Sequence, residues 1–406
     1  MTTFAIVGGV YRERCVEPLW DAIYGSAGRA LAATTQIAPG ARLVSYVDSA
    51  TATGAQALAD DCGATFEGHP TPASVCFDYL HPLAAPRINP QPGTVTNEPI
   101  TVSGDVVLRY GMLEGDAVVH AKKAIYDPQS SFGTQPFGAN GSTAERLAIV
   151  LNKAEAKSMT GIEDPEIAAK SLLGDGVEVV VLKMGPLGAL VMTANRVQRI
   201  PLYKSASVFK IGSGDVFSST FAALWGVQGL DPFEAADIAS RATAYYCENR
   251  SLPPPDPEAL RQQSFEPLTP GKGTVYLAGP FFDIGQRWLV EEANDYLLEM
   301  GANVFSPVHE VGPGPADIVA PEDIKGLERS DVVFAILNGM DPGTIFEVGY
   351  AVKKGIPVVG LAQNVRLEDL KMMEGTGCEI HSDFASAIYR ACLLYTSPSP
   401  RDLSTS

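Results

Sequence analysis

An Asp that follows small residues at the start of a predicted helix is the first feature with chemical potential. Asp215 comes directly after Gly212-Ser213-Gly214. Small residues let the backbone approach a phosphate closely, and the helix N-terminus supplies free N–H groups and a positive dipole end. An Asp there can accept the proton of a substrate hydroxyl as it attacks a γ-phosphate. Alone the pattern is weak, because such an Asp is as often only a helix cap.

A second carboxylate at a helix start is Glu347, in the first turn of a helix predicted over Thr344–Lys354. The positive end of the helix dipole stabilises its charged form, and the edge of a parallel sheet would place it in a ligand crevice. Asp323, on a helix upstream, could flank the same crevice. Two carboxylates in different environments are what a retaining glycosidase-type mechanism needs. On spacing alone, the simpler interpretation of Asp341 and Glu347 as a turn residue and a helix-start charge is favoured.

The elements around these residues alternate between strand and helix in both halves of the chain, which predicts parallel sheets. In the first half we expect strands over Phe4–Val7 and Val177–Leu182, and helices over Gly214–Trp225 and Pro232–Glu248. In the second half we expect strands over Thr274–Ala278, Asn303–Phe305, Asp331–Leu337 and Pro357–Leu361, and helices over Gln286–Met300, Pro321–Glu328 and Thr344–Lys354.

A run rich in proline divides the two halves, and proline blocks both helices and central strands. We therefore predict a domain over residues 1–250, a semi-rigid linker over 251–272 and a second domain over 273–393. The alternative is a long loop within one domain. Residues 394–406 are rich in Ser and Pro, resemble translated sequencing adapter, and are expected to be a non-native or disordered tail without function.

The composition excludes some classes of partner. The formal net charge is −17, whereas nucleic-acid binders need basic stripes. Small phosphorylated ligands stay possible, since backbone N–H groups and single cations can hold them. No apolar run approaches the roughly 20 residues of a membrane span, and the six cysteines show no zinc spacing. We expect a cytoplasmic protein.

The segment around Asp215 resembles the GAGD signature of the PfkB/ribokinase family of carbohydrate kinases. Further segments resemble motifs of that family in the same order over residues 1–262: Gly25-Ser26-Ala27-Gly28, Ile125-Tyr126-Asp127-Pro128, Asn152-Lys153-Ala154-Glu155, and Leu182-Lys183-Met184-Gly185 with Gly188. The resemblance implies a ribokinase-like α/β/α fold and a kinase that uses ATP and Mg²⁺.

By the same resemblance, Asp215 is the catalytic base. The other implied roles are an anion hole at Gly212, Ser213 and Gly214, an ATP site at Gly185 and Gly188, phosphate and indirect Mg²⁺ contacts at Asn152 and Glu155, and a sugar site at Gly25, Gly28 and Arg29.

The first half also departs from the family pattern. Phe209-Lys210-Ile211 replaces the usual Asp-Thr, no acidic residue directly follows Gly8-Gly9, and the lid region over 10–24 is short. Arg29 lies where sugar kinases often carry Asn, so it either favours a substrate with a phosphate or carboxylate or is a salt-bridged structural arginine. A catalytically silent, ligand-sensing module is the alternative to an active kinase.

Three ordered segments of the second half resemble nucleoside 2-deoxyribosyltransferases: Tyr276–Phe281 (YLAGPF), Glu322–Asp331 and Asp341–Tyr350. The resemblance implies a doubly wound, flavodoxin- or Rossmann-like parallel sheet. It implies that Glu347 attacks C1′ as the nucleophile. The other implied roles are sugar binding by Asp341, protonation of the leaving base by Asp323, orientation of Glu347 by Tyr276, and close backbone approach at Gly279.

One departure from this family's pattern bears on whether the second half of the chain hydrolyses the bond or exchanges the base. The family often carries an Asn near its C-terminus that can reach a neighbouring subunit, which implies a homo-oligomer, but here Lys371 lies in the comparable stretch. Related proteins include hydrolases of nucleoside monophosphates, so hydrolysis and base exchange both stay open. We expect a bifunctional enzyme of nucleoside or nucleotide salvage, with small-molecule nucleosides, nucleotides and sugars as substrates and neither nucleic acid nor membrane as partner.

Overall fold

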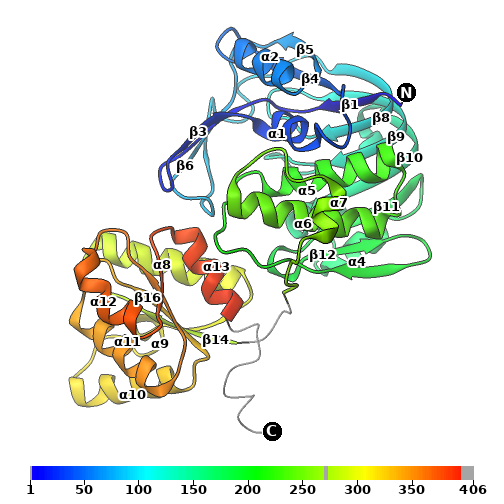
Figure 1. The fold of residues 1–406 in the computed structure, drawn as a ribbon. Coiled ribbons are helices and arrows are strands. Elements are labelled where there is room, and N and C mark those ends of the chain that lie inside the picture. The colour runs from blue at the N-terminus through cyan, green and yellow to red at the C-terminus, as the bar shows by residue number, and fades with distance from the viewer. Residues whose placement is uncertain (1, 269–272, 395–406) are drawn as a thin grey trace. The chain divides into compact units, whose positions relative to one another are not determined.

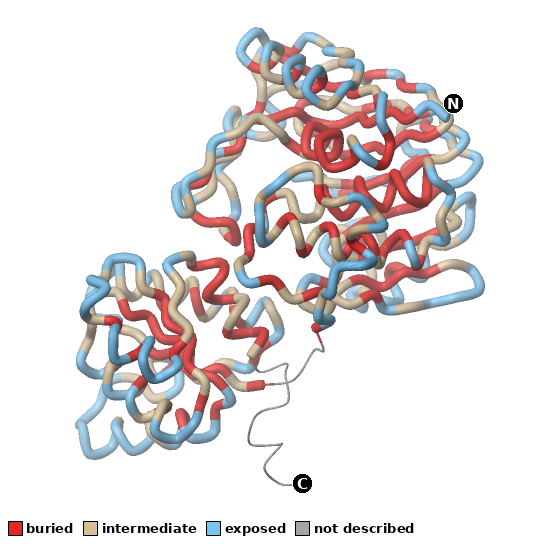
Figure 2. Tube along the Cα trace, viewed as in Figure 1, coloured by how far each residue is buried: buried red, intermediate tan, exposed pale blue. Residues whose placement is uncertain are grey.

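The computed structural model describes residues 2–268 and 273–394, which form two compact units (Figure 1). The N-terminal unit comprises Met1–Ser205 and Phe209–Pro267, and the C-terminal unit comprises Ala206–Val208 and Leu268–Ser406. Buried residues concentrate in the strands within each unit, as the red segments of Figure 2 show. Each unit therefore has a core of its own.

A nine-stranded sheet forms the centre of the N-terminal unit, in the order β13-β12-β11-β10-β9-β8-β1-β4-β5. Its strands are β1 (Phe4–Val7), β4 (Arg42–Val47), β5 (Thr65–Pro70), β8 (Ile100–Tyr110), β9 (Ala117–Asp127), β10 (Thr143–Asn152), β11 (Val177–Lys183), β12 (Ala189–Met192) and β13 (Val197–Ile200). The expectation of a parallel sheet is wrong at one edge, because β12 and β13 run antiparallel. Only a short turn joins β11 to β12, and a parallel connection needs a longer crossover.

Helices cover both faces of this sheet. Val181 of β11 packs in a core with residues of α1, α5 and α6, while its neighbours Val180 and Leu182 pack with residues of α3 and α4 on the other face. This alternation follows from the two-residue period of a strand and confirms the expected α/β/α layers. The helices are α1 (Gly25–Thr34), α2 (Ala52–Asp61), α3 (Lys153–Thr160), α4 (Pro165–Ser171), α5 (Ser213–Phe221, continued as a π-helix over Ala222–Gln228), α6 (Pro232–Asn249) and α7 (Pro257–Gln262).

A second, four-stranded sheet, which we call the lid sheet, was not anticipated beyond a short lid region. Its order is β3-β2-β6-β7. Its strands are β2 (Arg12–Cys15), β3 (Trp20–Ile23), β6 (Cys76–Tyr79) and β7 (Arg87–Asn89). In β2, Arg12 and Arg14 are exposed whereas Glu13 and Cys15 are buried. The alternation therefore turns one acidic side chain inward.

Part of the expected linker belongs to the N-terminal unit. Helix α7 is capped by Asp256, whose side chain accepts hydrogen bonds from the amides of Glu258 and Ala259, and Leu260 is fully buried. Proline at the first helical position is compatible with this start because its missing N–H needs no partner there. Residues 269–272 of the expected linker lie outside the described residues.

The C-terminal unit contains a five-stranded, all-parallel sheet in the order β15-β14-β16-β17-β18, which confirms the expected topology. Its strands are β14 (Thr274–Ala278), β15 (Asn303–Phe305), β16 (Val332–Ile336), β17 (Val358–Leu361) and β18 (Glu379–His381). Its helices are α8 (Ile284–Glu299), α9 (Pro307–Glu310), α10 (Ala316–Glu328), α11 (Pro342–Lys354), α12 (Leu367–Gly375) and α13 (Phe384–Leu394). Helix α10 begins five residues before the expected start at Pro321, which lies inside it.

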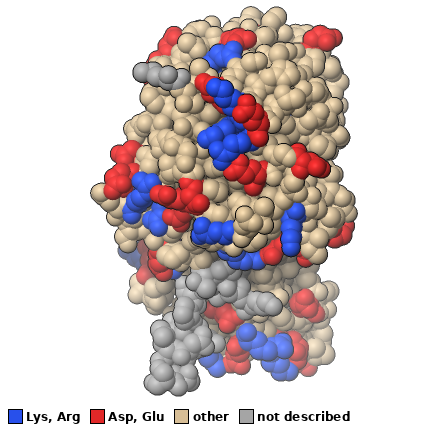
Figure 3. Space-filling view, turned by 90° about the vertical axis from the view of Figure 1, so that its right-hand side faces the viewer, with Lys and Arg blue, Asp and Glu red and all other residues tan. Residues whose placement is uncertain are grey.

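The described surface carries paired charges. On the face shown in Figure 3, acidic and basic side chains lie next to each other rather than in patches of one sign. Such interspersed charges are typical of a solvated surface. No helix within the described ranges has both the length and the apolar character needed to cross a bilayer. Of the expected tail, only Leu394 is described, as the last residue of α13.

Candidate active sites

The candidate kinase residues gather at the C-terminal edge of the large sheet. Asp127, Asn152 and Lys183 are the last residues of β9, β10 and β11, which run parallel and pair with one another. Asp215 lies in the first turn of α5. Ligands of open α/β sheets bind outside the carboxyl ends of the strands, so the topology brings these four residues to the expected place.

Both carboxylate oxygens of Asp215 have a protein partner. Arg29 Nη1 lies 3.1 Å from Oδ2, and Gln129 Nε2 donates to Oδ1 over 2.8 Å. The Tyr110 hydroxyl donates to the Asp215 carbonyl over 3.1 Å, which ties the start of α5 to the end of β8. The side chain is therefore held in a single orientation at the mouth of the site.

Arg29 is fully buried and all its nitrogens are engaged. Its two terminal nitrogens donate to the two oxygens of Glu13, and Nε donates to the Tyr246 hydroxyl over 3.2 Å. Burial lowers the pKa of the guanidinium, but the neighbouring Glu13 and Tyr246 raise it overall. Of the two interpretations of Arg29, the contacts match the salt-bridged arginine, and they leave no nitrogen for a substrate anion.

The two glycines ahead of Asp215 differ in what surrounds them. Gly212 has a φ of +75° and a side-chain carbon there would lie 2.1 Å from Arg29 Cζ, so the guanidinium excludes any other residue. A side-chain carbon on Gly214 would meet only Lys183 Nζ, at 3.6 Å. The N-terminus of α5 therefore faces open space bordered by an ammonium group, which suits an anion.

Lys183 and Asp127 form a buried ion pair beside this space. Lys183 Nζ donates to Asp127 Oδ2 over 2.8 Å, and the Ser218 hydroxyl donates to the same oxygen over 2.6 Å. Burial raises the pKa of Asp127 although Lys183 lowers it, and its Oδ1 is buried without a partner among the described residues. A buried carboxylate oxygen without a donor is an expected ligand or water contact.

Asn152 and Glu155 have a local structural role. The Asn152 side chain accepts a hydrogen bond from the Glu155 amide over 2.9 Å, and Glu155 Oε2 accepts one from the Asn152 amide over 2.7 Å. This is a capping box at the start of α3. Burial and then the neighbouring Asp127 carboxylate raise the pKa of Glu155 to about 7, and a cation placed beside this group would favour its charged form.

The other predicted glycines are explained by packing. A side-chain carbon on Gly25 would lie 2.4 Å from the Gly9 carbonyl, one on Gly28 would lie 2.9 Å from the Leu58 side chain, and one on Gly188 would lie 2.1 Å from the Ile200 carbonyl. Gly185 has a φ of +61° with open space around it. Only Gly185 of these four leaves room for a ligand next to its α-carbon.

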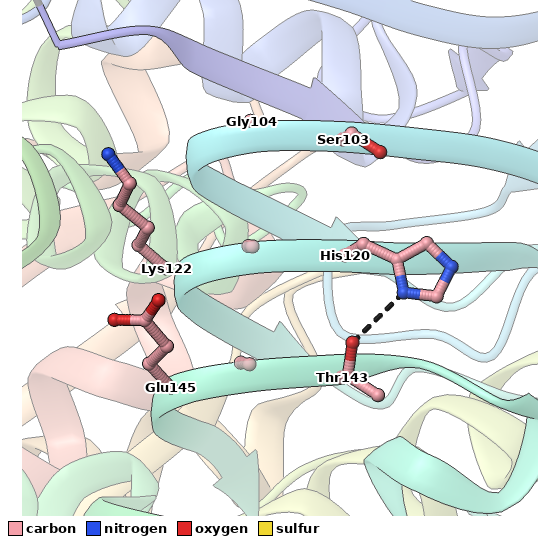
Figure 4. Close-up of a pocket in the computed structure, with 8 residues that line it drawn as sticks. Ser103, Gly104, His120, Lys122, Thr143 and Glu145 are labelled. Carbon is pink, nitrogen blue, oxygen red and sulfur yellow. Dashed lines mark hydrogen bonds between the residues drawn. The ribbon is translucent and has the colours of Figure 1, made fainter.

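A shallow hollow lies at the other end of the same strands (Figure 4). It is lined near the starts of β8, β9 and β10 by Ser103, Gly104, His120, Ala121, Lys122, Thr143, Ala144 and Glu145. His120 Nδ1 and Thr143 Oγ1 are 2.9 Å apart, while Lys122 and Glu145 point away from them. Because β8, β9 and β10 are parallel, this hollow is remote from Asp127 and Asn152.

In the C-terminal unit, the candidate nucleophile is held by a tyrosine. The hydroxyl of Tyr276 in β14 donates to Glu347 Oε1 of α11 over 2.5 Å. Burial raises the pKa of Glu347 to about 7. The hydrogen bond from Tyr276 lowers this pKa, whereas the charges of Asp323 and Asp341 raise it further. Burial and the Glu347 charge also raise the pKa of Tyr276, so the tyrosine stays a donor.

Two further carboxylates lie within electrostatic reach of Glu347. Burial raises the pKa of Asp323, and its Oδ1 is buried with no partner in the part of the chain that the structure describes. Asp341 caps α11, since its Oδ2 accepts hydrogen bonds from the amide and hydroxyl of Thr344 over 2.8 and 3.1 Å. The structure thus brings Asp323, Asp341 and Tyr276 within reach of Glu347.

Sequence reasoning missed Glu13, which contacts Arg29 in the kinase site. Glu13 lies in a charged run, and only the strand alternation of β2 shows that it turns inward. In the C-terminal unit, His309 bridges the hydroxyl of Ser306 and the carboxylate of Glu291, with both distances 2.8 Å. Phe282 and Phe346, near Gly279 and Glu347 in sequence, are exposed aromatic residues. Lys371 pairs with Glu368 on the exposed face of α12.

The N-terminal site fits a nucleotide-bound metal better than a resident one. Within the described residues, no group of three or more His, Cys, Asp or Glu side chains is arranged to hold a metal ion. Asp127, with a buried oxygen that has no partner, and Glu155 are the residues that suit an ion carried in by phosphates. Mg²⁺ commonly keeps several waters and binds through one or two carboxylates together with substrate phosphates.

Two family models match the chain, one in each of its two units. Residues 145–259 match the family model described as pfkB family carbohydrate kinase, and residues 275–393 match that described as nucleoside 2-deoxyribosyltransferase. The chain therefore carries a segment that matches pfkB-family carbohydrate kinases, followed by one that matches nucleoside 2-deoxyribosyltransferases.

One curated relative matches part of the chain. A 2-dehydro-3-deoxygluconokinase of Thermoproteus tenax is 31% identical over 111 residues, which are 26% of this chain and 34% of that protein. The chain thus spans about a third of that relative.

Three solved structures resemble this chain over about two thirds of its length. Ribokinase of Arabidopsis thaliana, complexed with ribose and ATP, matches with a TM-score of 0.50 and 18% identity over 65% of this chain and all of that one. Ribokinase of Thermotoga maritima matches with a TM-score of 0.46 and 17% identity, over 65% of this chain and 100% of that chain. Aminoimidazole riboside kinase of Salmonella enterica matches with a TM-score of 0.49 and 12% identity, over 64% and 98%. The likeness to the Arabidopsis structure shows that the unit has a ribokinase-like fold.

Proposed function

We propose that the protein is a bifunctional enzyme of nucleoside or nucleotide salvage. Its C-terminal domain cleaves or exchanges the N-glycosidic bond of a nucleoside or its monophosphate, and its N-terminal domain is an ATP-dependent kinase. The observation that carries the proposal is the hydrogen bond of 2.5 Å between Tyr276 and Glu347, beside two further carboxylates.

In the first half-reaction, a carboxylate oxygen of Glu347 forms a bond to C1′ of the sugar as the bond from C1′ to the base breaks. The electron pair of that bond goes to the base, and Asp323 supplies a proton to it. Burial raises the pKa of Asp323, which favours the protonated form that an acid needs. Positive charge develops at C1′ in the transition state, and the surrounding carboxylates stabilise it.

In the second half-reaction, water or another base attacks C1′ and returns its proton to Asp323, and Glu347 leaves as a carboxylate. The Tyr276 hydroxyl donates to the released oxygen and so lowers the cost of its charge. Asp341 has the geometry of a helix cap, and its second oxygen is proposed to hold sugar hydroxyls.

In the kinase domain, the acceptor hydroxyl oxygen forms a bond to the γ-phosphorus while the bond to the β-phosphate oxygen breaks. Asp215 takes the hydroxyl proton. The N-terminus of α5 at Gly212–Gly214 and the Lys183 ammonium would face the phosphate. Mg²⁺ would neutralise phosphate charge beside Asp127 and Glu155.

We further propose that the kinase acceptor is neutral. Arg29 is fully committed to Glu13, Asp215 and Tyr246. The other charges near the base are mostly carboxylates, so a phosphate or carboxylate on the acceptor would be repelled. A neutral nucleoside or sugar fits this environment.

The alternative is that the N-terminal domain only senses a ligand. The contact between Arg29 and Asp215 favours this alternative, because a guanidinium already occupies one oxygen of the base. Measured turnover of ATP with neutral acceptors distinguishes the two: no ADP formation with any acceptor, together with retained nucleotide binding, identifies a sensor.

Covalent capture tests the glycosidic reaction. A 2-fluoro-deoxynucleoside slows breakdown of the intermediate, so mass spectrometry should find a sugar adduct on the Glu347 peptide. An adduct on another residue contradicts the proposal. Decay of the adduct at the same rate with and without added free base identifies a hydrolase, whereas faster decay with base identifies a transferase.

A further inference from the structure

Three buried charged side chains join the lid sheet to the candidate base of the kinase site. Glu13 belongs to β2 of the lid sheet, Arg29 to α1 and Asp215 to α5. Arg29 is fully buried, and the side chains of Glu13 and Asp215 are 7% and 10% exposed. We call these three residues the Glu13–Arg29–Asp215 bridge.

The bridge has a definite geometry. Arg29 uses both terminal nitrogens on Glu13, with Nη1 3.0 Å from Oε1, and the same Nη1 lies 3.1 Å from Asp215 Oδ2. A guanidinium that pairs through both terminal nitrogens with one carboxylate has a fixed plane. The Glu13 carboxylate therefore sets the direction of Arg29 Nη1, and Nη1 in turn sets the position of Asp215 Oδ2.

The same guanidinium also shapes the anion site. Any side chain at Gly212 would collide with the Arg29 carbon Cζ at 2.1 Å. Arg29 thus touches both the glycine that opens the anion site and the base beside it. A movement of Arg29 would change both at once.

The other two charged residues of β2 face solvent. The other charged residues of β2, Arg12 and Arg14, form exposed pairs with Asp21 and Asp78 within the same sheet. Such exposed pairs contribute little to stability. Glu13 is the charged residue of β2 that reaches out of the lid sheet to the helices.

We propose that Glu13 and Arg29 are positioning residues that couple the lid sheet to the catalytic base. With the lid sheet in place, Glu13 holds Arg29 so that only Nη1 shares the base. Without it, the guanidinium is free to chelate both oxygens of Asp215, which then cannot receive a hydroxyl proton. This inference rests on the proposed kinase function.

The test compares Glu13→Gln with a matched control, Asp21→Asn, which removes an exposed ion pair from the same sheet. ADP formation is measured with Mg-ATP and either uridine or D-ribose as the probe acceptor. We expect Glu13→Gln to lower kcat about 10–100-fold, the usual size for misplacing a reacting group, with the KM for ATP within about twofold. Asp21→Asn should keep the wild-type kcat.

A second pair of variants guards against a merely structural role. Arg29→Lys has no planar pair of nitrogens to hold Glu13 and Asp215 together, so it should lose as much kcat as Glu13→Gln. The double variant, Glu13→Gln with Arg29→Lys, should lose no more than Arg29→Lys alone. Additive losses would overturn the coupling. An unchanged kcat in Glu13→Gln would overturn it as well.

Hydrogen exchange separates failure of the bridge from failure of the kinase. Without any substrate, residues 12–15, 20–23 and 76–79 should exchange faster in Glu13→Gln than in Asp21→Asn, while β14 and β16 stay unchanged. If no acceptor is turned over by the wild-type protein but this exchange difference is present, the kinase proposal falls and the link to the lid sheet stands. Equal exchange in the two variants overturns the bridge.

Discussion

The two candidate sites differ in how they treat buried carboxylates. In the N-terminal unit, Asp215 and Asp127 each touch a fixed cation, Arg29 and Lys183. In the C-terminal unit, among the residues that the structure describes, no Lys or Arg bonds to Glu347, Asp323 or Asp341, and the partner of Glu347 is a neutral tyrosine. The first arrangement suits a reaction that carries negative phosphates, and the second suits one that builds positive charge on a sugar.

Both sites nevertheless contain a glutamate whose pKa is raised to about 7. Burial is the largest cause in each. For Glu155 the next cause is the Asp127 carboxylate, whereas for Glu347 the next is the Tyr276 hydrogen bond, which works in the opposite direction. Glu155 and Glu347 thus have similar pKa values but different neighbours, so the neighbours rather than the pKa indicate the chemistry of each site.

The largest expected effect is on base release. Glu347→Ala should lower it by up to about 10⁶-fold, the size associated with loss of a covalent nucleophile. Glu322→Gln, which removes an exposed carboxylate on α10 paired with Lys325, is the matched control and should be unaffected. Product analysis by chromatography with a deoxynucleoside substrate measures both. Undiminished release by Glu347→Ala would contradict the assignment.

Loss of the proposed kinase base, Asp215, should have a smaller effect on the rate of its reaction. Asp215→Asn should lower phosphoryl transfer about 10²–10⁴-fold and leave ATP binding intact, because the backbone at Gly212–Gly214 is unchanged. Base release by the same variant should equal that of the wild type, while Glu347→Ala should keep full kinase activity. If either variant abolishes both reactions, the two sites are not independent.

The pH dependence of base release should shift in Tyr276→Phe. Glu347 must be ionised to attack, so the wild-type rate should rise with pH through about 7. The Tyr276 hydrogen bond lowers the pKa of Glu347, so its removal raises that pKa and moves the midpoint of the profile to higher pH. A rate–pH profile between pH 5.5 and 9 checks this, and a midpoint that falls or stays constant refutes the role of Tyr276.

Stability should depend on the same glutamate. The folded-state pKa of Glu347 lies above its ordinary value of 4.5, so its contribution to stability is present below about pH 4.5 and is lost as pH rises through about 7. Glu347→Gln cannot ionise and should be more stable than the wild type at pH 8, by about 1–3 kcal/mol, but not at pH 5. Denaturant unfolding at the two pH values measures the difference.

The smallest effect is expected from separating the domains. Cleavage within residues 269–272 should leave two soluble folded pieces, because each unit has its own core. A cut at Pro255 is the control and should destabilise the first piece, since it removes α7 and the buried Leu260. Circular dichroism and the two separate activities measure the outcome, and aggregation after the first cut contradicts the proposed boundary.

Local signals predicted much of the fold. The strands over Phe4–Val7, Thr274–Ala278 and Asn303–Phe305 have the predicted bounds, because short apolar runs bounded by turn residues are local features. The lid sheet was missed because its strands have only three or four residues and pair residues as far apart as Arg12 and Cys76. The antiparallel pairing of β11, β12 and β13 was missed because an alternation of strands and helices along the sequence gives no sign of a hairpin.

The sequence by itself determined the position of Asp215 in the first turn of a helix, since glycine, proline and capping residues act within a few positions of themselves. The prediction that Glu347 lies in a first turn is wrong, because α11 begins at Pro342 after the cap Asp341, two residues before the expected start, and so places Glu347 in its second turn. Only the tertiary structure decided what these carboxylates touch. Arg29 and Asp215 are 186 residues apart in the chain, and Tyr276 and Glu347 are 71 apart. Their contacts arise because α1 packs against α5 and α11 packs against β14, and a pattern of nearby residues contains no measure of such long-range packing.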